Sequence, residues 1–507
     1  MNFSNIKNLY KKHQLAVTLV VGTFLFFIST FWNPAIYIAS VFILVSYIFS
    51  SIEDIFAYSF YFMLFSGIIV FYVVLAVGTF LVVFVKYIAD VIKEKAEVHK
   101  KPLLATTVIV AIYSLIHYKL NDYGIFQGLL IIGLMYLIYV MFCYRKQISI
   151  RKLFKVMCIG MIATSLLSLL LYFCSSAEVF VFDNFDYTFR PVKEKVLLDV
   201  GGQYKRLELF SYHPNHLASF CMFLIAYAVY TMINNKQEKT DLIENIVMLS
   251  VGIIVGLLTL SKAFFIIFAL EIVFVFVYLI IQHKKQSLKF VIPIALVIIV
   301  GALVFHKQIA VIIKRLLPNG TNTSLDDLTT GRVGIWIKFI DELLSSPIKL
   351  IFGEGLFTTD IVDIGPHSIY IAILFRFGIV GTVALGWLIY TYIISVDSKL
   401  KLHFRKILPI VVFLVYSIQE ANIDERFFFF IIAVILLFAK TDKDDSSEFE
   451  PISRKKEKKL VEIGVDTKTT EQNQSETAEN TETLNNQNST TETNELNQNK
   501  NLFENKS

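Results

Sequence analysis

Long apolar segments recur along the first 440 residues, and they limit the possible fold more than any other feature of the chain. A helix needs about 20 apolar residues to cross the hydrocarbon core of a membrane. The chain is 55% hydrophobic and its mean hydropathy is +0.61, which is typical of a protein with many spans. The segments lie at about 14–31, 34–50, 55–85, 102–118, 124–142, 153–173, 216–233, 243–260, 263–281, 289–305, 367–395, 405–419 and 426–440. We therefore expect an all-α polytopic membrane protein with about 12–14 transmembrane helices.

Basic connections between the apolar segments predict the orientation of the chain. They lie at 86–101, 143–152, 234–241, 282–289 and 396–406, and each is expected to be cytoplasmic by the positive-inside rule. Two long connections, at about 174–215 and 306–366, then fall on the outer side. The N-terminus and the C-terminal tail are expected in the cytoplasm, and the chain in the cytoplasmic membrane.

The segment at 55–85 conflicts with this orientation. An N-terminus and residue 86 on the same side require an even number of crossings between them, but three apolar segments lie there. The third is unusually long and has Gly67 near its middle. We interpret it as a short or re-entrant segment followed by a full span.

The composition separates a membrane domain, 1–440, from a tail, 441–507. The tail is polar and of low complexity, so we expect it to be disordered. Short basic clusters between spans do not favour nucleic-acid binding. The four cysteines lack the spacing of a disulfide framework or a zinc site. No phosphate-binding loop or dinucleotide fingerprint is present, so nothing indicates a cofactor or an ATP-driven pump.

The outer segment 174–215 is rich in positive charge just before a helix start. Its basic residues are Arg190, Lys193, Lys195, Lys205 and Arg206. The sequence His213-Pro-Asn215 follows, and Asn215 is a candidate N-cap of the next helix. The segment predicts either an anion-binding site or a basic loop whose side chains reach to lipid headgroups. Lys262, in the tight outer turn at 259–264, has the same two interpretations.

The outer segment 306–366 contains an amphipathic helix. Apolar residues recur at helical spacing at Trp336, Phe339, Ile340, Leu343 and Leu344. Such a helix lies on a membrane surface or caps a bundle.

Polar and glycine residues flank this helix. Arg332, one turn before Trp336, can bind a phosphate near the helix N-terminus or serve as a plain interfacial arginine. Gly353 and Gly355 allow a close backbone approach or positive φ angles.

The stretch 365–381 begins as a loop and continues as a membrane helix. Gly365-Pro366 indicates a helix start, so His367 is expected at the outer interface. A neutral imidazole there can accept a proton from a hydroxyl, or can simply cap the helix. Arg376 lies nine residues further, on roughly the opposite helix face, and is interpreted as a structural arginine. Gly378 and Gly381 permit close approach of another helix.

These motifs together resemble the O-antigen ligase and Wzy-type polysaccharide polymerase superfamily. The family pattern is a His, then Asn, Ser or Gln, nine residues and GxxG, and it is met here by His367, Ser368 and Gly378 to Gly381. The GxG of Gly353 and Gly355, the TGRxxxW stretch at Arg332 and the HPNHL start at 213–217 are also similar. Lys262 follows Ser261 where the family usually has an arginine, and it lacks the arginine's bidentate fork.

The resemblance implies a GT-C-like membrane fold and a metal-independent glycosyltransferase. The donor would be an oligosaccharide on undecaprenyl pyrophosphate at the outer membrane face, with a flippase and a chain-length regulator as partner proteins. His367 would be the catalytic base. The candidate substrate-binding residues are Arg332, Lys262, Arg206, Arg190, His213, Asn215, Gly353 and Gly355. Direct displacement by the acceptor hydroxyl would invert the anomeric centre.

Three functions remain open at this point. The first is polymerisation of repeat units into a capsular, exo- or cell-wall polysaccharide. The second is ligase-like transfer of a finished glycan to a wall or lipid acceptor. The third is transport of a lipid-linked sugar, which predicts charged residues and broken helices inside the membrane. Few such features are apparent in the sequence, although Glu271 is an acid well inside an apolar segment.

Overall fold

The structure is a computed structural model. It describes residues 3–65, 77–116, 122–183, 186–200, 204–211, 213–234, 239–282, 331–355, 366–396 and 404–419, together with residues 296, 303, 306 and 310. The chain divides into two units, Met1–Ala439 and Lys440–Ser507. All described residues belong to the first unit, so the predicted disordered tail, 441–507, lies outside them.

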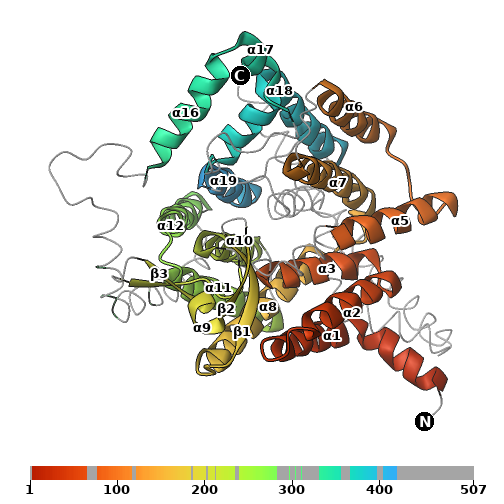
Figure 1. The fold of residues 1–507 in the computed structure, drawn as a ribbon, viewed down its shortest axis with the longest axis vertical. Coiled ribbons are helices and arrows are strands. Elements are labelled where there is room, and N and C mark those ends of the chain that lie inside the picture. Colours follow the sequence, from red (N-terminus) through yellow and green to blue (C-terminus); the bar gives the residue numbers. More distant parts are fainter. Residues whose placement is uncertain are drawn as a thin grey trace, which may run out of the picture. The chain divides into compact units, whose positions relative to one another are not determined.

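Helices make up most of the described chain (Figure 1). They are α1 (Phe3–Ser29), α2 (Ala35–Phe49), α3 (Ile52–Phe62), the short 3₁₀ helix η1 (Met63–Phe65), α5 (Thr79–Ile92), α6 (Lys100–Ile116), α7 (Asp122–Tyr144), α8 (Ile150–Tyr172), α10 (Pro214–Asn234), α11 (Lys239–Leu258), α12 (Lys262–Gln282), α16 (Arg332–Leu344), α17 (Pro347–Phe352), α18 (Ile369–Val396) and α19 (Phe404–Gln419).

Four described helical segments are long and apolar enough to cross a membrane. They are Ile150–Tyr172, Pro214–Met232, Lys239–Leu258 and Ile369–Tyr392. Shorter apolar helices occupy His13–Ser29, Ala35–Phe49 and Ile131–Tyr144. The described part of the chain is therefore that of a helical membrane protein. The number of 12–14 spans stays a prediction.

Two β-hairpins in the segment 174–215 were not predicted. β1 (Glu178–Asp183) pairs antiparallel with β2 (Asp186–Pro191), and β3 (Leu197–Val200) pairs antiparallel with β4 (Tyr204–Leu207). The short helix α9 (Val192–Val196) joins them. Valine and phenylalanine fill the middle of β1, and both residue types favour strands. The fold is helical in its spans, with strands added in this connection.

Several basic connections meet at one end of the helical unit, here called the Lys152 end. Lys152 Nζ lies 2.8 Å from Glu53 Oε2, which ties the start of α8 to the start of α3. Arg151 Nη2 lies 2.5 Å from Asp241 Oδ1, at the start of α11. Residues of two basic connections that the positive-inside rule predicts to be cytoplasmic, 143–152 and 234–241, thus lie together at one end of this unit.

The segment 55–85 folds back on itself in the part that the structure describes. Ser59 Oγ and Thr79 Oγ1 lie 2.9 Å apart, so α3 and α5 run side by side. Lys86 Nζ donates to Ser50 O at 2.8 Å, which returns the chain to the Lys152 end. Residues 66–76 lie outside the described residues, so the short segment and full span expected here, and the even number of crossings, stay predictions.

The other end of the unit, here called the His213 end, carries the two hairpins. Glu178 N donates to Thr30 O at 2.8 Å, so β1 is fixed to the turn between α1 and α2. Val192 N donates to Ala177 O at 2.9 Å, next to the end of α8. The described parts of the segment 174–215 are therefore folded onto the ends of the helices.

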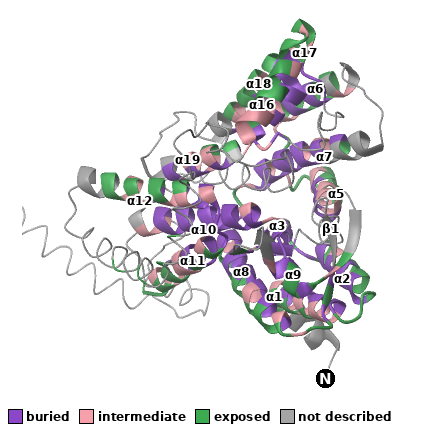
Figure 2. Ribbon diagram, turned by 60° about the vertical axis from the view of Figure 1, so that its left-hand side comes forward, coloured by how far each residue is buried: buried purple, intermediate pink, exposed green. Residues whose placement is uncertain are grey.

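Helix α10 lies at the centre of the unit (Figure 2). Of its apolar window, Pro214–Met232, 83% is buried, against 39–56% for the other three candidate spans. Tyr227 stacks on Phe154 of α8 with ring centroids 4.3 Å apart, and Phe223 packs on Tyr416 of α19. α10 begins at the His213 end, so its packing against α8 and α19 fixes the position of its first residues.

Candidate functional site

His213 caps the central helix α10. Its carbonyl accepts hydrogen bonds from the backbone N–H groups of His216 and Leu217, and its Nδ1 accepts from Asn215 N at 3.2 Å. The predicted cap at Asn215 is therefore wrong by two positions. Pro214 is already the first helical residue, so the capping position falls on the residue before it.

The protonation state of His213 follows from this contact. Because Nδ1 accepts a hydrogen bond, the proton of the neutral ring is assigned to Nε2. Desolvation lowers the pKa of His213 from 6.5 to about 3, and so do the positive charges of Arg206, Lys195, Arg332 and His367. His213 is thus a neutral hydrogen-bond donor near pH 7.

Residues from distant parts of the chain lie within electrostatic range of His213. Arg206 and Lys195 come from the hairpin segment, Arg332 begins α16, and His367 lies just before α18. All four act electrostatically on His213. We call these five residues the His213 cluster. The starts of α10, α16 and α18 carry positive partial charge, which adds to the attraction for an anion.

Arg206 fixes the geometry of the cluster. It is 5% exposed, its Nε donates to Thr259 O at 3.0 Å, and its Nη2 donates to Asn215 Oδ1 at 2.9 Å. β4 is thereby joined to the start of α10 and to the turn before α12. That turn is as tight as predicted, and Lys262 is the first residue of α12.

A buried carboxylate in this region was missed by the sequence analysis. Glu208 pairs with Lys195, and both side chains are less than a tenth exposed. Glu208 N also donates to Val196 O at 3.0 Å. The pair depends on how the chain folds back between 195 and 208, which no local pattern predicts. Glu208 offsets part of the positive charge and holds Lys195 in place.

The predicted amphipathic helix is confirmed as α16, with Arg332 as its first residue. Gly331 precedes it with a φ of 82°, a left-handed conformation. Phe339 and Leu343 are buried, and the Phe339 ring packs on Phe375 of α18 with centroids 5.0 Å apart. Ile340 and Leu344, predicted on the same apolar face, are exposed.

His367 lies two residues before α18, which begins at Ile369. Ser368 accepts the hydrogen bond of the first turn, from Ala372 N at 2.9 Å. A helix thus starts shortly after Gly365-Pro366, as predicted, but His367 lies just before its first turn and not within it. The φ of His367 is 47°, so the right-handed helix cannot extend back through it. This left-handed residue places the imidazole outside the helix.

Gly353 and Gly355 lie against α18 at the position where this helix is broken. α18 is broken at Gly378, whose φ is 61° and ψ −170°. Glu354 N donates to Phe375 O at 2.8 Å and Gly355 N donates to Arg376 O at 2.9 Å. The loop after α17 thus supplies donors to carbonyl groups at the break. The structure gives these glycines a packing role about 13 Å along α18 from Ile369.

Glycine is required on both sides of this contact. A Cβ on Gly353 would lie 2.5 Å from Arg376 O, and one on Gly378 would lie 2.4 Å from Ile351 O. We call this the Gly353–Gly378 contact. Arg376 beside it is 8% exposed, in keeping with a buried structural position.

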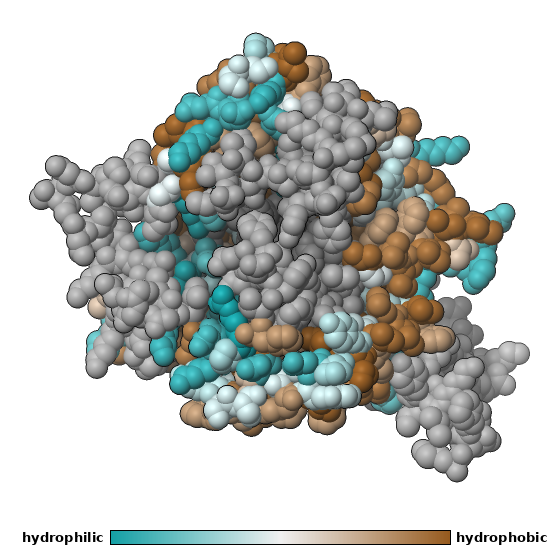
Figure 3. Space-filling view, in the orientation of Figure 1, coloured by the Kyte–Doolittle hydropathy of each residue, from teal (hydrophilic) through white to brown (hydrophobic). Residues whose placement is uncertain are grey.

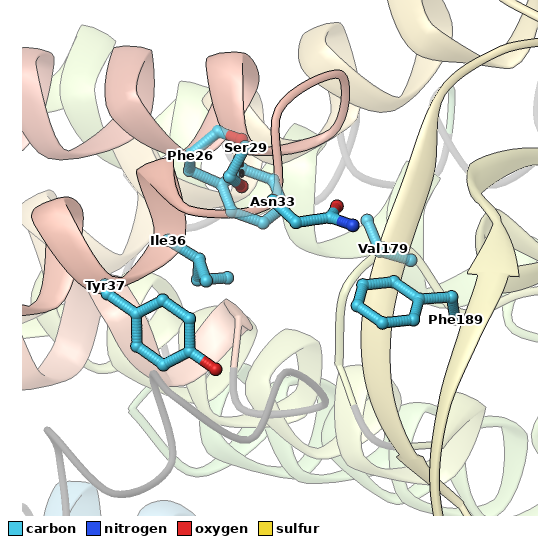
Figure 4. Close-up of a pocket in the computed structure, with 7 residues that line it drawn as sticks. All are labelled: Phe26, Ser29, Asn33, Ile36, Tyr37, Val179 and Phe189. Atoms are coloured by element: carbon cyan, nitrogen blue, oxygen red, sulfur yellow. Dashed lines mark hydrogen bonds between the residues drawn. The ribbon is translucent and has the colours of Figure 1, made fainter.

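Arg190 lies on β2, where it pairs with Val179 of β1. A small pocket of about 30 Å³ opens nearby, between this hairpin and the turn from α1 to α2 (Figure 4). Asn33 points from the turn toward Val179 and Phe189. The lining residues carry no charge, so the pocket is not a candidate site for a charged group.

The described residues contain no group of three or more His, Cys, Asp or Glu side chains arranged to hold a metal ion. The sequence matches no protein-family model and no curated protein.

Proposed function

We propose that the chain is a glycosyltransferase that polymerises lipid-linked oligosaccharide repeat units at the outer face of the cytoplasmic membrane. The observation that carries the proposal is the His213 cluster, in which four cationic or titratable side chains from three parts of the chain act electrostatically on His213 beside a candidate span. Undecaprenyl pyrophosphate is an anion carried on a lipid, and it suits such a place. The resemblance of the motifs around Arg332 and His367 supports the same substrate class.

The proposed reaction transfers the sugar without a metal. The acceptor hydroxyl attacks the anomeric carbon, the bond from that carbon to the pyrophosphate oxygen breaks, and His367 accepts the hydroxyl proton. Arg332, Arg206 and Lys262 stabilise the negative charge that grows on the pyrophosphate. His213 contributes as a neutral donor from Nε2, because its Nδ1 is bonded to Asn215 N.

A polymerase of this kind works with other proteins. A flippase would deliver the repeat unit to the outer face, and a chain-length regulator would limit the product. A ligase differs only in its acceptor, which would be a wall or lipid group.

The test is the length of the glycan in cells that carry His367→Ala. We expect single repeat units in place of polymer, because the acceptor hydroxyl loses its base. His13→Ala is the matched control, since His13 is exposed and belongs to α1. Gel electrophoresis of the glycan, with membrane levels of each variant, provides the measurement.

The possible outcomes separate the functions. Long but unattached glycan in His367→Ala cells would identify a ligase. Normal attached polymer, with the variant present at the normal level, would exclude His367 as the base.

Transport of a lipid-linked sugar is a second candidate, and two observations favour it. α18 is broken at Gly378, and Glu271 of α12 is 2% exposed with no hydrogen-bond partner for either carboxylate oxygen among the described residues. Broken helices and buried acids occur in transporters. Repeat units trapped on the inner face in cells lacking the protein would support this function over the polymerase.

A further inference from the structure

Glu271 is a carboxylic acid buried in the middle of α12. It lies nine residues after Lys262, the first residue of the helix, and eleven residues before Gln282, the last. These spacings place it about 13 Å and about 16 Å from the two ends of the helix. Glu271 is 2% exposed, so almost none of it is accessible to water.

Apolar side chains accompany Glu271 on its own helix. Ile267 is buried in the main hydrophobic core, and Phe268, Phe274 and Val275 pack against the same core. All four lie three or four positions from Glu271, which is the spacing of residues on one helix face. α12 packs against α10 and α19 (Figure 1, Figure 2). Glu271 therefore points with these apolar residues into the interior of the helical unit.

Neither carboxylate oxygen of Glu271 has a hydrogen-bond partner among the described residues. The facing helices α10 and α19 have five ionisable residues whose side chains the structure describes: His216, Cys221, Tyr227, Tyr230 and Tyr416. None of these five forms a hydrogen bond with either oxygen. On α11, the charged residues Lys239, Asp241 and Glu244 lie in the first two turns. The carboxyl group is thus buried without a counter-charge or a donor in the described part of the chain.

The helical unit around Glu271 has an apolar outer surface. Hydrophobic side chains gather over α5 and α6, on the right-hand side of Figure 3, and include the exposed Leu81, Val85, Leu104 and Val108. Four described segments are long and apolar enough to cross a membrane. With lipid around the unit, a polar group in its interior has to find its partners inside the protein.

A proton is the ligand that suits this position. An ionised carboxyl without a counter-charge is far more costly to bury than a neutral one, so a buried acid responds by taking up a proton. A metal cation would need several oxygen ligands. The described residues hold no group of three or more His, Cys, Asp or Glu side chains arranged for one. One carboxyl group by itself is enough to bind a proton.

The neutral acid is still short of partners in this packing. A protonated carboxyl has an O–H donor and a carbonyl acceptor, and burial without a partner is unfavourable for both. Any movement of α12 that admits a water molecule to Glu271 is therefore favoured by the acid itself. Water is also the molecule with which the acid can exchange its proton.

We propose that Glu271 is a proton-binding site inside the membrane domain. It is protonated at neutral pH, and it exchanges its proton with water when α12 moves against α10 and α19. The inference concerns only the packing of α12 and does not rest on the proposed polymerase function, so its failure would leave that function untouched.

Infrared spectroscopy of the purified full-length protein in lipid at pH 7 tests the charge state. The C=O stretch of a protonated carboxyl is well separated from the bands of a carboxylate. We expect a protonated-carboxyl band that is missing from Glu271→Gln, a variant of nearly the same size and shape. Glu53→Gln is the matched control and should keep the band, because Glu53 pairs with Lys152 and is ionised. Lys152 retains Asp54 as a partner in that variant.

Transfer of the wild-type protein into D₂O tests the exchange. We expect the band to move to lower frequency as the O–H group becomes O–D. A band that keeps its frequency after the exposed amides have exchanged would show a sealed structural acid and overturn the proposal. Absence of the band at pH 7 would show that a partner keeps Glu271 ionised, and it would also overturn it.

A hydrophobic carbodiimide assigns the site without any substitution, in case Glu271→Gln fails to fold. Such reagents react with protonated carboxyl groups in apolar surroundings. We expect mass spectrometry of the labelled wild-type protein to find the adduct on Glu271. Adducts on other carboxyl groups with none on Glu271 would contradict the assignment.

Discussion

His213 has a charge state set by its neighbours and not by its own chemistry. A histidine exposed at a helix start titrates near pH 6.5, but burial lowers the pKa of this one, and so do the charges of the buried Arg206 and Lys195 and of Arg332 and His367. Its Nδ1 is committed to the backbone of α10. The result is a donor that stays uncharged near pH 7.

We predict that His213 stays neutral, with the proton on Nε2, at every pH above about 4, because its pKa is about 3. An unfolded chain protonates this residue near pH 6.5, so folding stability should fall as the pH drops from 6.5 toward 3. Nitrogen-15 NMR of histidine-labelled protein measures the tautomer directly. A His213→Asn variant, which retains a capping oxygen, should lose this pH dependence. An Nδ1–H tautomer at neutral pH would contradict the assignment.

At the scale of single elements, the break in α18 is stabilised by a loop that is distant in sequence. The carbonyl groups of Phe375 and Arg376 accept N–H groups from Glu354 and Gly355. Buried carbonyl groups at a helix break need such donors. The GxG motif and the first glycine of the GxxG motif are therefore two sides of one contact.

We predict that Gly353→Ala destabilises the protein far more than Gly331→Ala. Both glycines have positive φ angles, of 78° and 82°, but only Gly353 faces backbone atoms at 2.5 Å. Strain alone should cost Gly331→Ala about 1–2 kcal/mol. Strain and overpacking together should cost Gly353→Ala roughly 2–6 kcal/mol. Thermal unfolding in detergent compares the two variants, and equal costs would show that the close contact is not present.

At the scale of the whole molecule, the helical unit has two chemically different ends. The Lys152 end is held by ion pairs between the starts of α3, α8 and α11, including Lys152 with Glu53 and Arg151 with Asp241. The His213 end carries the hairpins and the His213 cluster. A site for an outer-face lipid pyrophosphate requires that the His213 end faces outward.

We predict the orientation of these ends from the positive-inside rule. In a Cys174→Ser background, a membrane-impermeant thiol reagent should label Lys193→Cys on intact cells. It should label Gln147→Cys only after the membrane is opened. Both positions are exposed, so accessibility within the fold is matched. Labelling of Gln147→Cys on intact cells would reverse the orientation and remove the proposed outer site.

The sequence by itself determined the helical membrane class, the amphipathic helix after Gly331 and the tight turn before Lys262. Each follows from local hydrophobic periodicity or from residues adjacent in the chain. It also identified Gly353 as a position for positive φ, because only glycine adopts such backbone angles at little cost.

Only the tertiary structure decided which residues lie near His213. Helix starts that are far apart in the chain bring Arg332 and His367 to His213, and no local pattern specifies that meeting. The pairing of Glu208 with Lys195 depends on how β3 and β4 fold together. The N-cap of α10 is His213 and not Asn215, because Pro214 is already helical. α18 begins after His367, because the positive φ of His367 is incompatible with a right-handed helix. Long-range packing sets the charge state of His213 and the contacts between distant segments, whereas sequence periodicity sets only which segments form helices.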